Sequence, residues 1–278
     1  MNSSTNVVLL GTGTPNADPE RCGPSVAIVV NDTPYIVDCG PGVVRRAAAA
    51  YKMGIEALRV DNLCHLFITH LHSDHTVGLA DFIFTPWVLE RNKPLDVFGP
   101  VGTISMTEHI LAAYAADIGL RKTGLEQANE YGCEVNATEI QTGVCYQDDK
   151  VTIEAFAVDH GDWPAYGYKF TTPDKVIVVS GDTRPTPNII EQAKDCDVLV
   201  HEVYSAEKFK ARPEQWQKYH SSMHTSTYEL AETASEIKPR LLVLYHQLFW
   251  GATEDELLAE IRQNYDGEVV SGNDLDVF

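Results

Sequence analysis

The segment Thr69-His70-Leu71-His72-Ser73-Asp74-His75 constrains this chain more than any other part of its sequence. It places four potential metal ligands within six residues, directly after the apolar run Cys64–Thr69, which predicts a buried strand. The first two histidines can project from an irregular turn onto one metal ion, while the aspartate and the third histidine face a second ion. The alternative is a polar loop with solvated histidines, but three of the chain's ten histidines in one hexapeptide argue against it. Because zinc favours imidazole and carboxylate ligands, the segment predicts a two-metal site.

Two metals need more ligands than this hexapeptide supplies, and the remaining candidates follow predicted strands. His160 follows the apolar run Val151–Val158, Asp182 follows Lys175–Ser180, and His246 follows Leu241–Tyr245. Loops at the edge of a sheet can converge on one site. Taken alone, each of these residues is more often a structural histidine or a turn aspartate. Taken with the hexapeptide, they complete a ligand set.

Strands and helices are expected to alternate along one α/β domain that covers residues 1–278. Helices flank mixed sheets in two similar halves, an order typical of two sheets with helices outside. The expected strands are Asn6–Leu10, Ser25–Val30, Tyr35–Asp38, Cys64–Thr69, Leu95–Phe98, Val151–Val158, Tyr166–Thr171, Lys175–Ser180, Asp197–His201, Leu241–Tyr245 and Glu268–Val270. The expected helices are Val43–Tyr51, Thr76–Glu90, Gly102–Asp117, Asn188–Lys194, Ser226–Ile237 and Thr253–Arg262.

Several short motifs follow one another along nearly the whole chain. They are Leu10-Gly-Thr-Gly-Thr-Pro15, Val37-Asp-Cys-Gly40, the HxHxDH segment, His160, Ser180-Gly-Asp-Thr183, His201-Glu202, His224-Thr-Ser226 and His246. With these motifs in this order, the chain resembles the metallo-β-lactamase superfamily. Within it, the chain is most similar to the ribonuclease Z-like branch, which also contains arylsulfatase-type members. The resemblance implies a four-layer αββα sandwich, a single domain in the metallo-β-lactamase fold, with both metals at one edge.

The same resemblance assigns the ligands to two zinc ions per chain, with Mn²⁺ or Fe²⁺ as alternative metals. His70, His72 and His160 would hold the first ion. Asp74, His75 and His246 would hold the second, and Asp182 would bridge the two. Asp38 would orient the ligands through hydrogen bonds, although a strand-end aspartate that caps the next helix is the alternative.

Three residues are expected to take part in catalysis: Asp74, His224 and Glu202. A hydroxide that bridges two zinc ions would attack an ester centre, and Asp74 would orient it. His224 would donate a proton to the leaving group. It lies just before the predicted helix at Ser226, where the helix dipole disfavours imidazolium, so a carboxylate is needed beside it. Glu202 matches the family's partner for that role, whereas His224 could also be only a polar residue before a helix.

The substrate expected from the sequence is a small-molecule ester, most of all a phosphodiester, with nucleic acid disfavoured. Members that process transfer RNA precursors carry a long arm between the third-motif histidine and the SGD motif, and here only residues 161–181 stand there. The formal net charge of −19 disfavours a broad nucleic-acid surface. Trp163, Phe249 and Trp250 flank predicted ligands and suit a small apolar substrate, although core packing explains them equally well.

Several other functions stay open at this stage. An arylsulfatase-like or lactone-cleaving hydrolase is the main alternative on the same scaffold. A ribonuclease Z-type endoribonuclease, a β-lactamase and a non-catalytic metal-binding protein rank lower. The intact ligand set argues against the last of these, because a degenerate member would be expected to have lost ligands. A panel assay on aryl phosphodiesters, aryl sulfates, lactones and β-lactams separates the enzymatic alternatives.

The six cysteines are scattered without a CxxC pair, and several lie in apolar runs. They predict free buried thiols and a reducing compartment. No signal peptide or membrane-spanning run is visible, so the expected location is cytoplasmic, or secreted or periplasmic if a signal has been removed. No membrane partner is expected, and a homodimer stays open.

Overall fold

The computed structural model describes residues 4–278, which form two units built around one sheet each. The first unit comprises the chain up to Gly11, Ala17–Ile140 and Asp274–Phe278. The second comprises Thr12–Asn16 and Gln141–Asn273. The expectation of one domain over residues 1–278 stays a prediction.

The first unit contains a six-stranded sheet in the order β1-β2-β3-β4-β5-β6. The pairs β1–β2 and β2–β3 are antiparallel, and β3, β4, β5 and β6 run parallel. β2 and β3 form a hairpin that turns at Asn31-Asp32, with Asn31 in the left-handed region at φ 56°. The strands are β1 (Thr5–Gly11), β2 (Ser25–Val30), β3 (Thr33–Val37), β4 (His65–Phe67), β5 (Leu95–Gly99) and β6 (Val135–Glu139).

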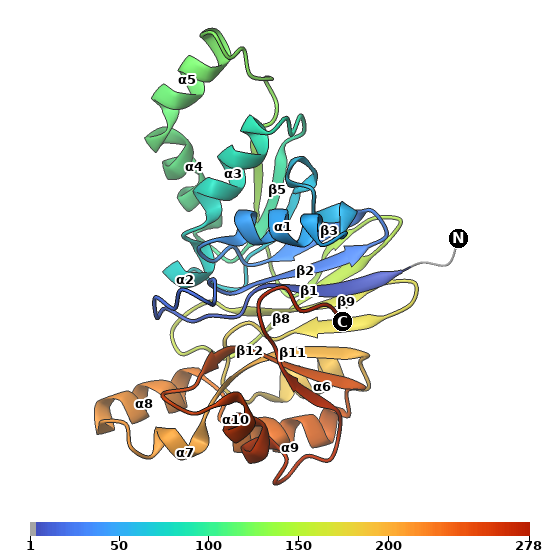
Figure 1. The fold of residues 1–278 in the computed structure, drawn as a ribbon, viewed down its shortest axis with the longest axis vertical. Helices are drawn as coiled ribbons and strands as arrows, with labels where there is room; N and C mark the ends of the chain where they lie inside the picture. Colours follow the sequence, from blue (N-terminus) through green and yellow to red (C-terminus); the bar gives the residue numbers. More distant parts are fainter. Residues whose placement is uncertain (1–3) are drawn as a thin grey trace. The chain divides into compact units, whose positions relative to one another are not determined.

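Helices pack against this sheet and enclose an aliphatic core. Val43, Val44, Ala47 and Ala50 of α1 are buried and share that core with Leu66 of β4. The chain continues into α4 and α5, drawn in green beside β5 at the end of the unit away from β1 (Figure 1). The helices are α1 (Val43–Lys52), α2 (Ser73–Thr76), α3 (Leu79–Val88), α4 (Thr103–Ala113) and α5 (Ala115–Thr123), with the 3₁₀ turns η1 (Glu56–Leu58) and η2 (Val60–Asn62).

Two predicted helices of this unit have different bounds in the structure. The range Thr76–Glu90 covers the end of α2 and then α3, with a break at Val77-Gly78. The range Gly102–Asp117 covers α4 and the start of α5, which runs on to Thr123. No residue of α5 is buried.

The second unit contains a seven-stranded sheet in the order β13-β12-β11-β10-β9-β8-β7. Strands β7 to β10 form an antiparallel meander, and β10, β11, β12 and β13 run parallel. The first sheet likewise begins antiparallel and ends parallel, as expected of two similar halves. The strands are β7 (Gly143–Gln147), β8 (Thr152–Ala157), β9 (Tyr166–Thr171), β10 (Val176–Val179), β11 (Val198–Tyr204), β12 (Leu241–Leu248) and β13 (Val269–Ser271).

The helices of the second unit begin at strong capping signals. Ser226 caps α9 and Thr253 caps α10, each in a reciprocal capping box with a glutamate three residues later. Leu230, Ala231 and Ala234 of α9 face a core shared with β11 and β12. The helices are α6 (Pro187–Ala193), α7 (Ala206–Phe209), α8 (Glu214–Met223), α9 (Thr227–Ile237) and α10 (Glu254–Ile261). Strands β6 and β7 and helices α7 and α8 were not expected from the sequence.

His246 lies inside β12 and not at its end, contrary to the sequence-based expectation. Glu202 pairs with Tyr245 and Val203 pairs with Gln247, so His246 is the extra residue of a β-bulge. Its backbone is left-handed at φ 45°. A bulge turns a side chain away from the alternation of a regular strand, so it can aim this histidine towards a site.

Two further observations concern the whole described chain. Among residues 4–278, no helix combines the length and the apolar character that crossing a membrane requires. All six cysteines are free thiols, as expected from their scattered positions.

Arg91 is buried in the first unit, with 1% of its surface exposed. Its Nη1 donates to the carbonyls of Leu63 and Phe82, at 2.8 and 3.1 Å. Its Nη2 donates to the carbonyls of Ile83 and Gly132, both at 2.8 Å. Burial lowers the pKa of this guanidinium to about 10. One side chain therefore ties η2, α3 and the segment before β6 together.

Replacing Arg91 with Met should destabilise the protein by about 3 kcal/mol, because four buried carbonyl groups lose their donor. Urea unfolding measures the loss. Arg45→Met is the matched control, since the Arg45 side chain is 78% exposed and its ion pair with Asp81 is worth at most about 1 kcal/mol. Equal losses in both variants would show that the four hydrogen bonds do not support the fold.

Candidate metal centre

The HxHxDH segment brings its four predicted ligands together within the first unit. His70 Nε2 lies 3.0 Å from His72 Nδ1, and the rings of His70 and His75 are 4.2 Å apart between centroids. His75 Nε2 lies 3.6 Å from Asp74 Oδ2. The segment achieves this because the chain leaves β4 and turns into the short helix α2, which begins at Ser73 and carries Asp74 and His75.

Asp38 holds this segment from the end of β3. Its carboxylate accepts hydrogen bonds from the backbone N–H and the hydroxyl of Thr69, both at 2.8 Å, and from His75 Nδ1, also at 2.8 Å. Asp38 is 1% exposed and left-handed at φ 61°. A carboxylate on one ring nitrogen of a histidine orients the other nitrogen for a metal. The expected role of Asp38 agrees with these contacts, whereas no cap of α1 by its side chain is present.

Gly40 allows the loop after β3 to approach α2 closely. A Cβ on Gly40 would lie 2.7 Å from the carbonyl oxygen of Asp74. The neighbouring Cys39 N–H donates to the carbonyl of His75 at 2.8 Å, and Gly78 N–H donates to the carbonyl of Cys39 at 2.9 Å. The Val37-Asp-Cys-Gly40 motif thus positions the ligand segment through both its aspartate and its glycine.

The second unit places its predicted ligands along one edge of its sheet, after β8, after β10 and near the end of β12. Asp182 follows β10, and His246 lies in the parallel strand β12, with Nε2 3.5 Å from Asp182 Oδ2. His160 follows β8, and its Nδ1 lies 2.8 Å from the carbonyl of Met223, which leaves Nε2 as the nitrogen for a metal. All three side chains are buried. The carboxyl edge of parallel strands is where open α/β sheets bind ligands.

His224 and Glu202 also lie at this edge. His224 Nδ1 is 3.4 Å from Glu202 Oε1 and 3.9 Å from Asp182 Oδ2. Glu202 Oε1 accepts from the backbone N–H groups of Thr225 and Thr183, at 2.9 and 3.3 Å. Burial and the nearby Asp182 raise the pKa of Glu202 well above its usual range, while the two N–H donors and His246 oppose the rise.

The helix environment of His224 differs from the expectation. His224 does precede α9, but it is also the C-cap of α8, with its N–H donating to the carbonyl of His220 at 2.9 Å. The C-terminus of a helix favours imidazolium. The dipole of α8 therefore offsets the unfavourable effect that was expected from the helix beginning after Ser226.

The donor sets suit zinc in chemistry and spacing. Imidazole nitrogens and carboxylate oxygens are the ligands zinc prefers, and tetrahedral zinc places two nitrogens about 3.3 Å apart. The 3.0 Å between His70 Nε2 and His72 Nδ1 is close to that value. In the second unit, His160, Asp182 and His224 offer atoms within 4.8 Å of one another, as do Glu202, His224 and His246. His224 therefore supplies one imidazole more than the expected ligand set of this unit.

Two other residues near the motifs have structural roles, and a third belongs to a group of aromatic rings that was not predicted from the sequence. His201 is buried, its Nδ1 lies 2.6 Å from the carbonyl of Glu202, and burial lowers its pKa to about 4, so it stays neutral. Phe249 packs against the core of the second unit. Trp250 contacts His220 of α8, in a group of aromatic rings that sequence reasoning missed. Its only signal was the run Trp216-Gln-Lys-Tyr-His220.

The chain belongs to the metallo-β-lactamase superfamily, in its ribonuclease Z-like branch. The family model described as "Beta-lactamase superfamily domain" matches residues 33–247. "Ribonuclease Z" of Mycolicibacterium gilvum is 33% identical over 275 residues, which are 97% of this chain and 94% of that protein. The chain is accordingly a metal-dependent hydrolase, and its family implies a dinuclear metal site.

Solved structures show the same fold. The metallo-β-lactamase fold protein YhfI from Bacillus subtilis matches with a TM-score of 0.76 and 17% identity, over 99% of both chains. Human tRNase Z, short form, matches with a TM-score of 0.72 and 19% identity, over 98% of both chains. The predicted metallo-β-lactamase fold, with mixed sheets flanked by helices, is confirmed.

The expected partners were wrong. The sequence predicted a small-molecule ester as the substrate and disfavoured nucleic acid. Relatives that match nearly the whole chain are instead named Ribonuclease Z. Net charge misled because it sums the whole molecule, whereas binding depends on the local field. The missing arm misled because the relative named Ribonuclease Z aligns over 94% of its own length with a chain that has no such insertion.

Replacing Asp38 with Ala should lower the affinity for zinc about 10- to 100-fold, because His75 loses the carboxylate that orients it. Competition with a chromophoric chelator measures the affinity, and circular dichroism checks that the fold is retained. Asp61→Ala serves as the control, since Asp61 forms an ion pair with Arg59. An Asp38→Ala variant that holds zinc as tightly as the control would refute the orienting role.

Proposed function

We propose that this chain is an endoribonuclease of the ribonuclease Z type, which hydrolyses a phosphodiester bond of a transfer RNA precursor. The observation that carries the proposal is its 33% identity to a protein named Ribonuclease Z along 97% of its length. The likeness to a solved structure named tRNase Z, over 98% of both chains, agrees with it. The intact donor clusters of both units agree with a hydrolytic function.

Seven residues are proposed to hold two zinc ions: His70, His72, Asp74, His75, His160, Asp182 and His246. Zinc supplies a Lewis acid that activates water and takes up developing negative charge. Mn²⁺ and Fe²⁺ are alternative metals, because imidazole and carboxylate ligands accept them as well.

Side chains of the protein are proposed to orient the attacking water and to protonate the leaving group. Asp74 is proposed to orient the attacking water in addition to its role as ligand. His224 carries the proton for the leaving ribose oxygen on Nε2, since Nδ1 faces Glu202 at 3.4 Å. Glu202 holds the ring in that orientation, and its own position is fixed by the N–H groups of Thr183 and Thr225. A positioned general acid of this kind contributes about 10²- to 10⁴-fold to rate.

The zinc-loaded protein should cleave a transfer RNA precursor and contain about two zinc ions per chain. Asp182→Ala should lose metal and abolish turnover while its sheet structure persists, because Asp182 follows β10 without being part of it. Gel analysis of the products and elemental analysis of the protein provide the measurements.

Asp174→Ala is the matched control for that variant, because Asp174 lies in the exposed turn between β9 and β10. It should cleave at the wild-type rate with full metal content. A wild-type protein that takes up zinc but leaves the precursor intact would refute the proposed substrate. Full activity in Asp182→Ala would refute the ligand assignment.

Removing His224 should slow RNA cleavage about 10²- to 10⁴-fold but slow bis(p-nitrophenyl) phosphate, used as a chemical probe, only slightly. A ribose oxygen is a poor leaving group that needs a proton, whereas nitrophenolate departs as a stable anion. Glu202→Gln should show the same trend more weakly, since it acts through His224. The measurement is kcat/KM on both substrates for His224→Ala, Glu202→Gln and wild type.

Metal content decides between two roles for His224. If it is a general acid, His224→Ala keeps its zinc. Loss of zinc would instead make His224 a ligand, which its position within 4.8 Å of His160 and Asp182 allows. Equal slowing on both substrates with zinc retained would mean that His224 binds or positions the substrate.

A further inference from the structure

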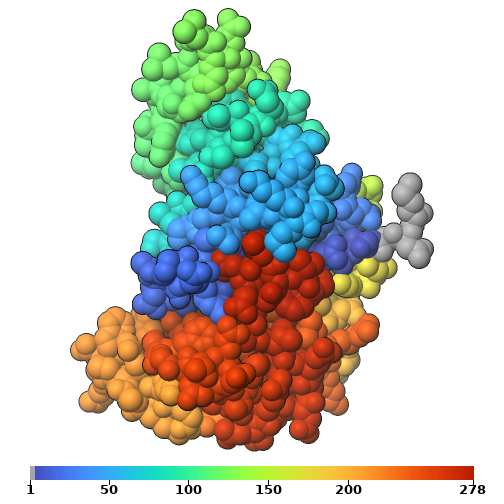
Figure 2. Space-filling model, in the orientation of Figure 1, coloured from blue at the N-terminus to red at the C-terminus, as the bar shows by residue number. Residues whose placement is uncertain are grey.

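Helix α8 of the second unit presents large aromatic side chains to solvent. Trp216 is 44% exposed and Tyr219 is 39% exposed, although both are among the larger apolar side chains of the protein. Figure 2 shows α7 and α8, in orange, at the surface of this unit. Two exposed aromatic rings three residues apart lie on one side of a helix, so they form one surface feature. We call Trp216, Tyr219, His220 and Trp250 the aromatic patch.

The rings of the aromatic patch are in mutual contact. The centroids of Trp216 and Tyr219 are 5.8 Å apart, and Trp216 stacks on His220 at 5.8 Å with 27° between the planes. The ring of His220 lies 4.7 Å from that of Trp250. His220 is buried, so it supports the exposed rings from beneath. The exposed rings are thus held in place by packing, which lowers the entropy cost of stacking a ligand on them.

The patch leads directly to His224. The ring of Tyr219 lies 6.4 Å from the ring of His224, and the ring of His220 lies 5.6 Å from it. His224 is the C-cap of α8, so the helix that carries the exposed aromatics ends at the proposed proton donor. A substrate segment that passes along α8 therefore leads towards the proposed proton donor.

The local charge around the patch is opposite to that of the whole chain. Residues 207–218 contain Lys208, Lys210, Arg212 and Lys218 against Glu207 and Glu214, whereas the whole chain has 40 acidic and 21 basic residues. Lys208 and Lys210 are engaged in ion pairs with glutamates.

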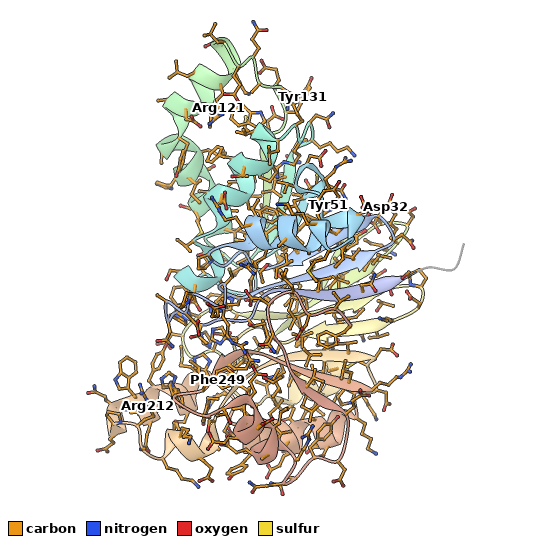
Figure 3. The ribbon with its side chains drawn as sticks, viewed as in Figure 1. Asp32, Tyr51, Arg121, Tyr131, Arg212 and Phe249 are labelled. Atoms are coloured by element: carbon orange, nitrogen blue, oxygen red, sulfur yellow. The ribbon has the colours of Figure 1, made fainter. Side chains whose placement is uncertain are left out.

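The other two cations remain available for a ligand. Within residues 4–278, neither Arg212 nor Lys218 has a carboxylate in ion-pair range. The Arg212 guanidinium lies 5.2 Å from the centre of the Trp250 ring, and Figure 3 labels Arg212 on this side of the second unit. Cations beside exposed aromatic rings are the combination that binds single-stranded nucleic acid, because the rings stack on bases and the cations contact phosphates.

We propose that the exposed face of α8 is a binding subsite for the single-stranded RNA segment that flanks the scissile phosphodiester. Unpaired bases stack on Trp216 and Tyr219, and Lys218 and Arg212 contact the phosphates. The subsite rests on the proposed function, since it takes RNA as the substrate.

The composition of the exposed face of α8 fits a subunit interface less well than it fits an RNA-binding surface. The core of a subunit interface is depleted of charged residues and more apolar than its surroundings. The exposed face of α8 instead intersperses its rings with Gln215, Lys218, Ser221 and Ser222, all of them exposed. An interspersed polar and aromatic surface suits the bases and phosphates of a nucleic-acid strand.

The test is the affinity for a short fluorescein-labelled oligouridylate, measured by anisotropy, with a gel to confirm that the probe stays intact. Trp216→Ala and Tyr219→Ala should each weaken binding about tenfold, and Trp216→Phe should restore most of the loss because it keeps a ring. Tyr131→Ala is the matched control: Tyr131 is 59% exposed and lies in the first unit, where Figure 3 labels it. Its affinity should equal that of wild type.

Salt dependence tests the cations separately. Lys218→Gln should reduce the slope of log affinity against log salt by about one, because one phosphate contact is lost. Lys52→Gln, an exposed lysine of α1 in the first unit, should leave the slope unchanged. On a transfer RNA precursor, Trp216→Ala should raise KM and leave kcat near the wild-type value. The difference should vanish on a precursor whose single-stranded extension is trimmed.

Equal oligouridylate affinity in wild type, Trp216→Ala and Tyr219→Ala would overturn the subsite, even if the precursor is cleaved. Analytical ultracentrifugation tests whether a second copy of the chain binds this surface instead. If the wild type is a dimer and Trp216→Ala is a monomer with unchanged RNA affinity, α8 is a subunit interface and the proposal is overturned. A wild type that binds oligouridylate through α8 but does not cleave the precursor would refute the proposed function and support the subsite.

Discussion

The buried carboxylate of Asp38 is the contact on which the ligand cluster of the first unit depends. Asp38 directly follows β3. Its carboxylate forms three hydrogen bonds of 2.8 Å, two with Thr69, which lies after β4, and one with His75 of helix α2. A buried carboxylate must be satisfied, so the chain after β4 has to turn towards it. Gly40 allows the same turn by leaving room for the carbonyl of Asp74.

The second unit organises its functional edge through Glu202 in a comparable way. This buried glutamate receives the backbone N–H groups of Thr183, from the Ser-Gly-Asp-Thr motif, and of Thr225, from the His-Thr-Ser motif. It therefore positions Asp182 and His224 by holding the residues that follow them. The β-bulge at His246 adds the third side chain at this edge. Motifs far apart in the sequence thus share one acceptor.

Local signals in the sequence predicted most of the elements. The apolar runs predicted the strands that carry the motifs, and the predicted helices Ser226–Ile237 and Thr253–Arg262 begin within one residue of α9 and α10. The misses have physical causes. Strands β6 and β7 and helix α5 contain no fully buried residue, so packing against a core does not require an apolar run along them. The bulge at His246 depends on pairing with β11, which no local pattern records.

The sequence by itself determined the family, the fold class and the candidate metal ligands, because HxHxDH and the strand-end motifs combine a rare donor density with a fixed order. Only the tertiary structure decided what surrounds them. It placed His224 at the end of α8 as well as before α9, and it gathered Trp216, Tyr219, His220 and Trp250 around that helix. Whether an aromatic residue packs in a core or faces solvent depends on neighbours distant in the chain, so the same letters in the sequence allowed both outcomes.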